Sequence, residues 1–191
     1  MVKLSFWFTE FRTAIDLLNS GKSMQEIKEL SQKENIFAAP TEARANQIYC
    51  TISSRIACLD KSFYQLFEQS ALSTQKLIAL IAIMKADSLF FDFVYEVYRE
   101  KLLIGTDEFV DRDIRIFFKD KRLQSEKVAK WTDYTQKRLG TCYKTMLSEA
   151  GIIDRNHGKR KILKPILDKA LEQCLIANDM ELFIHALTGV R

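Results

Sequence analysis

The sequence predicts a mainly α-helical fold, and three observations support this. The chain has 191 residues, of which 47% are hydrophobic, so it can bury a sizeable core. Only six glycines and two prolines interrupt it, which favours long helices joined by short turns. Helix start and stop signals also bracket most of the apolar periodic stretches. We expect two helix-turn-helix-like modules joined by a buried central helical pair, with a β-hairpin wing in the second module. The predicted domains are residues 1–70 and 71–191.

The first module begins with a helix over about residues 7–18, which ends at Asn19-Ser20-Gly21. Ser23 is placed to cap the next helix, and Glu26 three residues later completes a capping box. A longer third helix is expected from Thr41 to about residue 59. Two short helices, a tight turn and a longer helix resemble a helix-turn-helix, although plain helical bundles share this pattern.

The central pair is expected over residues 74–84, capped by Ser73, and residues 88–103, capped by Asp87. The second of these helices is apolar around much of its circumference, which is typical of a helix at the centre of a fold. Its aromatic cluster favours core packing over a ligand pocket. The charged residues Lys85, Asp87 and Asp92 interrupt the apolar stretch 77–97, so no membrane span is predicted.

The second module predicts a helix-and-hairpin order that is typical of winged helix-turn-helix domains. A helix should begin near Thr106-Asp107 and reach residue 119, followed by a short helix capped by Ser125. Thr132 should cap a long helix to residue 150. A hairpin should then follow over residues 152–163, with its turn at Asn156-His157-Gly158.

Positive charge is concentrated in this second module. Residues 119–164 contain thirteen Lys and Arg against five Asp and Glu, a formal charge of +8, so the rest of the chain carries −4 within the total of +4. Helical periodicity places Lys137, Thr141, Lys144 and Ser148 opposite the apolar face of the long helix. Such a face suits phosphates and base edges, although a merely solvated basic face is the alternative. The candidate nucleic-acid contacts are Lys121, Arg122, Lys130, Lys137, Arg138, Thr141, Lys144, Arg155, His157, Lys159, Arg160 and Lys161.

No catalytic or metal-binding motif is evident. The four cysteines lack metal-ligand spacing and are interpreted as thiols of a reducing cytoplasm, and only two histidines are present. The N-terminal residues do not resemble a signal peptide. No phosphate-binding glycine loop or nucleophile elbow occurs. We therefore expect a cytoplasmic protein without cofactor, metal or enzymatic activity.

An ordered set of short motifs resembles the BrxA family of the bacteriophage exclusion (BREX) defence systems. The motifs are Glu10-Phe11-Arg12, Glu34-Asn35-Ile36-Phe37, the stretch from Lys85 to Phe93 with Glu96-Val97 and Glu100-Lys101, Trp131, and Leu147 to Ile153. The resemblance implies an accessory protein of a phage-resistance operon, working beside a methyltransferase, a phosphatase-like protein and an AAA+ ATPase. It also implies helix-turn-helix-like domains that bind double-stranded DNA, and it carries no catalytic residues over to this chain.

The leading hypothesis is a non-catalytic accessory protein of phage defence that binds double-stranded DNA and other BREX components. A second hypothesis is RNA binding in transcription control, because the family also carries a label likening it to the antitermination factor NusB. A third is a protein-interaction adaptor whose acidic N-terminal part docks a partner.

Overall fold

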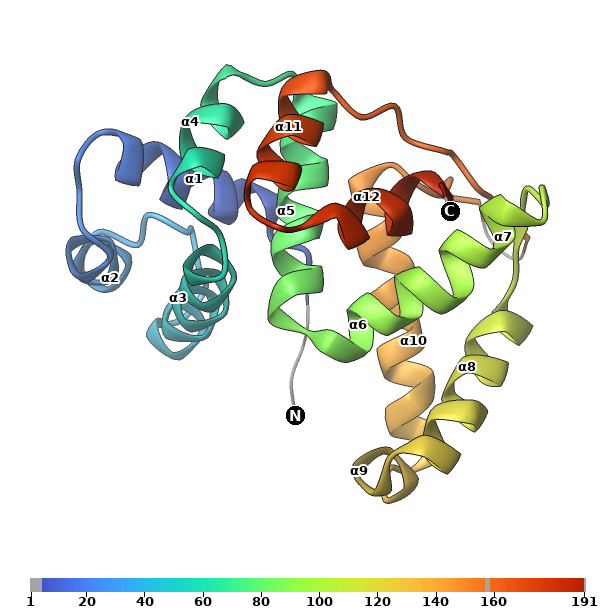
Figure 1. The fold of residues 1–191 in the computed structure, drawn as a ribbon. Coiled ribbons are helices and arrows are strands. Elements are labelled where there is room, and N and C mark those ends of the chain that lie inside the picture. Colours follow the sequence, from blue (N-terminus) through green and yellow to red (C-terminus); the bar gives the residue numbers. More distant parts are fainter. Residues whose placement is uncertain (1–4, 157–158, 191) are drawn as a thin grey trace. The chain divides into compact units, whose positions relative to one another are not determined.

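The structure is a computed structural model that describes residues 5–156 and 159–190. It is mainly helical, which confirms the predicted fold class (Figure 1). The chain forms two compact units, an N-terminal unit of Trp7–Ala86 and a C-terminal unit of Asp87–Arg191 with Met1–Phe6. The boundary expected after residue 70 therefore falls inside the N-terminal unit. The two helices of the expected central pair belong to different units.

The N-terminal unit contains five helices, which are α1 (Phe8–Asn19), α2 (Met24–Lys33), α3 (Glu42–Ala57), α4 (Ser62–Gln69) and α5 (Leu72–Ala86). The predicted capping box at α2 is present, because Ser23 accepts from the backbone N–H of Glu26 and the Glu26 carboxylate accepts from Ser23. The Thr41 hydroxyl caps α3 as expected. Helix α4 was not predicted, and α5 begins before the expected cap at Ser73.

The core of the N-terminal unit forms around α5, whose residues 77–84 are all buried. Helices α1, α3 and α4 each contact α5. The rings of Phe11 in α1 and Phe67 in α4 meet edge to face, with centroids 5.7 Å apart. Helix α5 is apolar all round because it is surrounded by other helices.

The C-terminal unit contains seven α-helices, one π-helical turn and two short strands among the described residues. They are α6 (Ser88–Phe93), η1 (Val94–Tyr98), α7 (Arg99–Leu103), β1 (Glu108–Phe109), α8 (Asp111–Gln124), α9 (Glu126–Ala129), α10 (Asp133–Ala150), β2 (Arg160–Lys161), α11 (Lys169–Ala177) and α12 (Glu181–Thr188). Elements α6, η1 and α7 follow one another without a break and form the predicted helix after Asp87, which we call the central helix. The Asp87 carboxylate accepts from the N–H groups of Leu89 and Phe90. The π-helical turn in its middle was not expected.

Aromatic side chains fill the core of the C-terminal unit. The Phe93 ring lies 5.2 Å from that of Phe117 and 5.1 Å from that of Tyr143, measured between centroids. Phe93 therefore joins the central helix to α8 and α10. The buried Tyr98 hydroxyl donates to the Leu163 carbonyl at 3.1 Å and ties the segment after β2 to this helix. The aromatic cluster is thus core, as predicted.

The small sheet contains a strand that was not predicted. Strands β1 and β2 pair antiparallel, with Glu108 opposite Lys161 and Phe109 opposite Arg160. The two expected hairpin arms pair antiparallel at a bridge between Ile153 and Ile162, where Asp154 N–H donates to the Lys161 carbonyl and Leu163 N–H donates to the Ile152 carbonyl. The segment after Thr106 was expected to begin a helix, and this prediction is wrong. Its Phe109 side chain is 0% exposed in the strand, and α8 starts only at Asp111. Pairing between segments fifty residues apart leaves no local pattern in the sequence.

Candidate nucleic-acid interface

Helix α10 is the element on which the predicted site depends. Its first turn is capped by the Thr132 hydroxyl, which accepts from the N–H of Thr135 at 3.2 Å. Its last turn ends at Gly151, which has a left-handed conformation with φ 82°. Tyr143, Met146, Leu147 and Ala150 are buried on the core side. Both predicted ends and the predicted packing face are therefore confirmed.

The opposite side of α10 is polar and free of acidic residues from Tyr134 to Ser148. Lys137, Thr141 and Thr145 are exposed there. Lys137 makes no ion pair with any residue that the structure describes. Ser148 departs from the expectation, because it is half-buried and donates to the Asp154 carbonyl.

Tyr134 extends this face toward the start of the helix. Its side chain is 65% exposed, and its hydroxyl accepts from the Arg138 guanidinium at 3.3 Å. This contact holds the half-buried Arg138 along the helix surface. The sequence reasoning missed Tyr134, although its place four residues before Arg138 was a usable signal. We define the α10 face as Tyr134, Lys137, Arg138, Thr141 and Thr145.

Lys144 is engaged within the protein. Its ammonium lies 2.6 Å from a carboxylate oxygen of Asp111, and its side chain is 17% exposed. The hydrogen bond from Lys144 is the main reason that the pKa of Asp111 lies below its ordinary value, with Arg160 and Arg115 adding to this. Lys144 is therefore less available to phosphate than the periodicity alone suggested.

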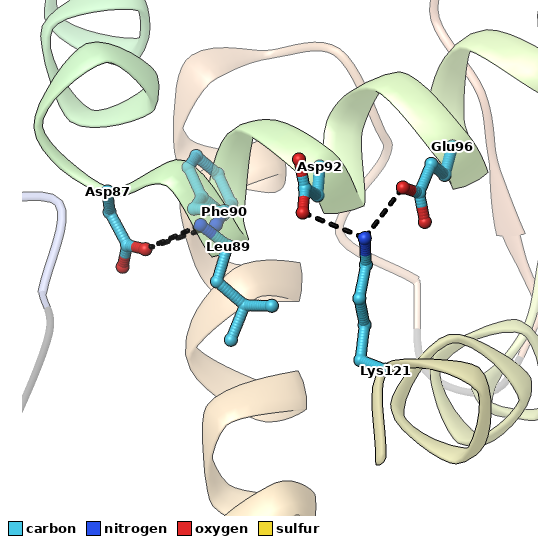
Figure 2. A network of polar contacts seen from close by, with 6 residues as sticks. All are labelled: Asp87, Leu89, Phe90, Asp92, Glu96 and Lys121. Atoms are coloured by element: carbon cyan, nitrogen blue, oxygen red, sulfur yellow. Dashed lines mark hydrogen bonds and ion pairs between the residues drawn. The ribbon is translucent and has the colours of Figure 1, made fainter. Parts of the chain in front are cut away.

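Lys121 is not a surface contact. Its ammonium lies 2.8 Å from Asp92 and 2.7 Å from Glu96, and its side chain is 7% exposed (Figure 2). Burial acts to lower the pKa of Lys121, but the hydrogen bonds that its ammonium donates to the two carboxylates, together with their negative charge, outweigh it, so the pKa is raised. Lys121 is therefore far less available to phosphate than its place in the basic segment suggested. Lys121 instead fastens α8 to the central helix.

The segment around β2 supplies further cations of the predicted set. Arg155 and Lys161 are exposed, and neither makes an ion pair with a described residue. Lys159 is exposed but lies 3.1 Å from Glu108, and Arg160 is half-buried. His157 lies outside the described residues.

The turn region that joins α8 to α10 carries the remaining two candidates. Arg122 lies 3.4 Å from Asp133, and their side chains are 44% and 94% exposed. Lys130 is exposed and follows α9. Helices α8 and α10 lie side by side with α9 at their connecting end, so these two cations lie at the same end of α10 as Tyr134 (Figure 1).

Other chemistry is not evident among the described residues. Over residues 5–156 and 159–190, no three His, Cys, Asp or Glu side chains cluster as metal ligands would. Within the same part of the chain, no helix has the length and apolar character needed to cross a bilayer.

The fold and the exposed α10 face define a mainly helical protein that presents cations and hydroxyls on one helix. A crystal structure of an uncharacterized protein from Magnetospirillum magneticum shares the fold, with a TM-score of 0.81, 16% identity, and coverage of 97% of this chain and 95% of that one.

Two sequence comparisons then give the family. The BrxA family model matches residues 1–179. The "BREX protein BrxA" of Bacillus cereus (strain H3081.97) is 36% identical over 182 residues, which cover 95% of this chain and 91% of that protein. The chain belongs to the BrxA family, accessory proteins of BREX phage defence. The resemblance noted in the sequence is thereby confirmed.

Proposed function

We propose that this BREX accessory protein binds double-stranded DNA without catalysing a reaction, and that the α10 face lies in the major groove. The observation that carries the proposal is the acid-free exposed side of α10, where Lys137 stands unpaired beside Thr141 and Thr145. A helix of this width fits the major groove, and cations on it can neutralise phosphates.

The segment around β2 supports the same proposal. Arg155 and Lys161 are exposed cations in the polypeptide that directly follows α10. In winged helix-turn-helix proteins the corresponding hairpin contacts the DNA backbone beside the groove that the helix enters. Phosphate contacts from both elements would fix the orientation of the helix but would carry little sequence information.

The test is a fluorescence-anisotropy titration of a DNA duplex at several salt concentrations. Lys137→Ala with Lys161→Ala removes one unpaired cation from each element, whereas Lys144 is avoided because Asp111 already holds it. We expect weaker binding to all duplex sequences and a salt slope smaller by about two units. Lys22→Ala with Lys61→Ala is the matched control, because it removes two exposed charges from the N-terminal unit.

Two outcomes would contradict the proposal. Equal loss of affinity in the control pair would show a general charge effect rather than a binding face. In a competition at equal salt, preference for structured RNA over duplex DNA would favour the RNA-binding alternative.

A further inference from the structure

Exposed apolar side chains are unevenly distributed over the molecule. Among the described residues, every exposed large hydrophobic side chain except Leu72 lies in the C-terminal unit. Tyr134 belongs to the α10 face, but the other exposed apolar side chains contribute little to phosphate binding, so the proposed DNA contact does not explain them. Clustered exposed apolar groups bordered by charge are typical of protein–protein contacts.

One cluster lies along α8. Arg112, Ile116, Lys119 and Leu123 follow one another at intervals of four, three and four residues, and all four are exposed. We call this row the α8 stripe. Ile116 is 47% and Leu123 84% exposed, on the side opposite the buried Ile114 and Phe118. Neither Arg112 nor Lys119 makes an ion pair with a described residue.

A second cluster lies where α11 turns into α12. Ile176, Asp179, Glu181 and Leu182 are all exposed there, and we call them the α11–α12 corner. Ile176 is 52% and Leu182 56% exposed. Neither Asp179 nor Glu181 has an ion-pair partner in the part of the chain that the structure describes. The corner therefore combines two aliphatic side chains with two unpaired acids.

The two surfaces match in composition, since each has two aliphatic side chains and each has two unpaired charges of opposite sign. They do not meet within one molecule. Helix α12 contacts η1 and α7, and α8 contacts η1, with the central helix between them in Figure 1.

We propose that the α8 stripe of one molecule binds the α11–α12 corner of a second copy of this chain. The charge complementarity of the two rows sets the orientation, and burial of Ile116, Leu123, Ile176 and Leu182 supplies the apolar contact. Two different surfaces meet, so the contact is heterologous and builds either a closed ring or an open filament of copies. A dimer results only if each of two copies places its stripe on the corner of the other. Surfaces this small give a weak, transient association in the micromolar range.

Sedimentation velocity over about a hundredfold range of micromolar concentration tests this, at about 50 mM and about 500 mM salt. We expect wild-type protein to associate at the lower salt and to dissociate at the higher. Lys119→Glu places an acid opposite the acidic corner, and Glu181→Lys places a cation opposite the basic stripe. Each variant alone should associate roughly tenfold more weakly than wild type.

Mixing these two variants is the decisive step. The reversed stripe of one then faces the reversed corner of the other with opposite charges, and the unchanged corner of the first can meet the unchanged stripe of the second. The mixture should therefore associate more tightly than either component alone. Leu123→Ser should weaken association without any change of charge. Lys22→Glu in the N-terminal unit is the matched charge control and should associate as wild type does, and circular dichroism checks that every variant is folded.

Several results would overturn the proposal. Wild-type protein that stays monomeric over the whole range would do so, as would a mixture that fails to associate. Equal weakening by Lys22→Glu would reduce the effect to overall charge. If Lys119→Glu lowered DNA affinity and left association unchanged, the stripe would be a DNA-binding surface instead.

Discussion

At the scale of single residues, lysines of similar sequence surroundings have different environments. Lys119 and Lys121 are two positions apart in α8, yet the first is exposed and the second is buried between two carboxylates. Helix geometry turns these positions to different sides, and the central helix supplies Asp92 and Glu96 on only one of them. A count of charges along the chain cannot separate these two roles.

Lys121→Ala should lower the free energy of unfolding by about 1–3 kcal/mol, because Asp92 and Glu96 would remain close together without their common partner. The two carboxylates are 40% and 45% exposed, so water limits the loss. Urea unfolding measures it, and Lys119→Ala should change stability by less than about 0.5 kcal/mol. The raised pKa of Lys121 means that its contribution persists at neutral pH and is lost only as pH rises through that pKa. If Lys121→Ala left the free energy of unfolding unchanged, the proposed role of the buried ion pairs would be contradicted.

Gly140 lies where α10 packs against Ile114 of α8. A methyl group placed on it would lie 2.5 Å from the Cγ2 of Ile114, so the Ile114 side chain or one of the two helices would have to shift. We expect Gly140→Ala to destabilise the protein by about 1–3 kcal/mol despite the better helix propensity of alanine. Ile114→Leu removes the branched methyl, so the double variant should lose less than the sum of the two single variants. Strict additivity in thermal unfolding would count against this contact.

At the scale of elements, caps and glycines agree with the helices that form. Ser23, Thr41, Asp87, Ser125 and Thr132 each cap the helix that follows them. These contacts lie within three residues along the chain, so local sequence is enough to predict them. The pairing of β1 with β2 and the ion pair of Asp111 with Lys144 join separate elements and have no such local signal.

Asp111→Asn should make the free energy of unfolding less sensitive to acidic pH. The folded-state pKa of Asp111 is lowered below 3.8, so its contribution to stability is present above that pH and is lost as pH falls through the lowered pKa. Wild type should therefore lose more stability than Asp111→Asn on acidification below about pH 4, as measured by urea unfolding. The effect is small because the Asp111 side chain is 62% exposed.

The same Asp111→Asn variant removes the carboxylate that holds Lys144, so its affinity for duplex DNA should rise severalfold. A fall in DNA affinity would count against the α10 face.

At the scale of the whole molecule, a small net charge conceals a strong local concentration. The +8 of residues 119–164 is opposed by −4 elsewhere in the chain. Burial of Lys121 and pairing of Lys144 and Lys159 reduce the charge available at the surface, but Lys137, Arg155 and Lys161 remain unpaired among the described residues. A polyanion should therefore respond to this local charge rather than to the total.

Retention on heparin at the isoelectric pH of about 8.8 measures this polarisation directly. The wild-type protein should still bind at low salt, because its unpaired cations are concentrated in one segment. Lys137→Ala with Lys161→Ala should elute at lower salt than Lys22→Ala with Lys61→Ala, although both pairs remove the same charge. Elution of wild type without retention would favour the adaptor hypothesis.

The sequence by itself determined the helical class, the caps, the ends of α10 and its division into an apolar and a polar side. These features depend on contacts between near neighbours and on a periodicity of 3.6 residues. Only the tertiary structure decided that Lys121 is buried, that Asp111 holds Lys144, that β1 pairs with β2, and that Tyr134 extends the exposed face. The first three depend on partners from other elements, and for Tyr134 the structure shows which side the packing of α10 leaves to solvent.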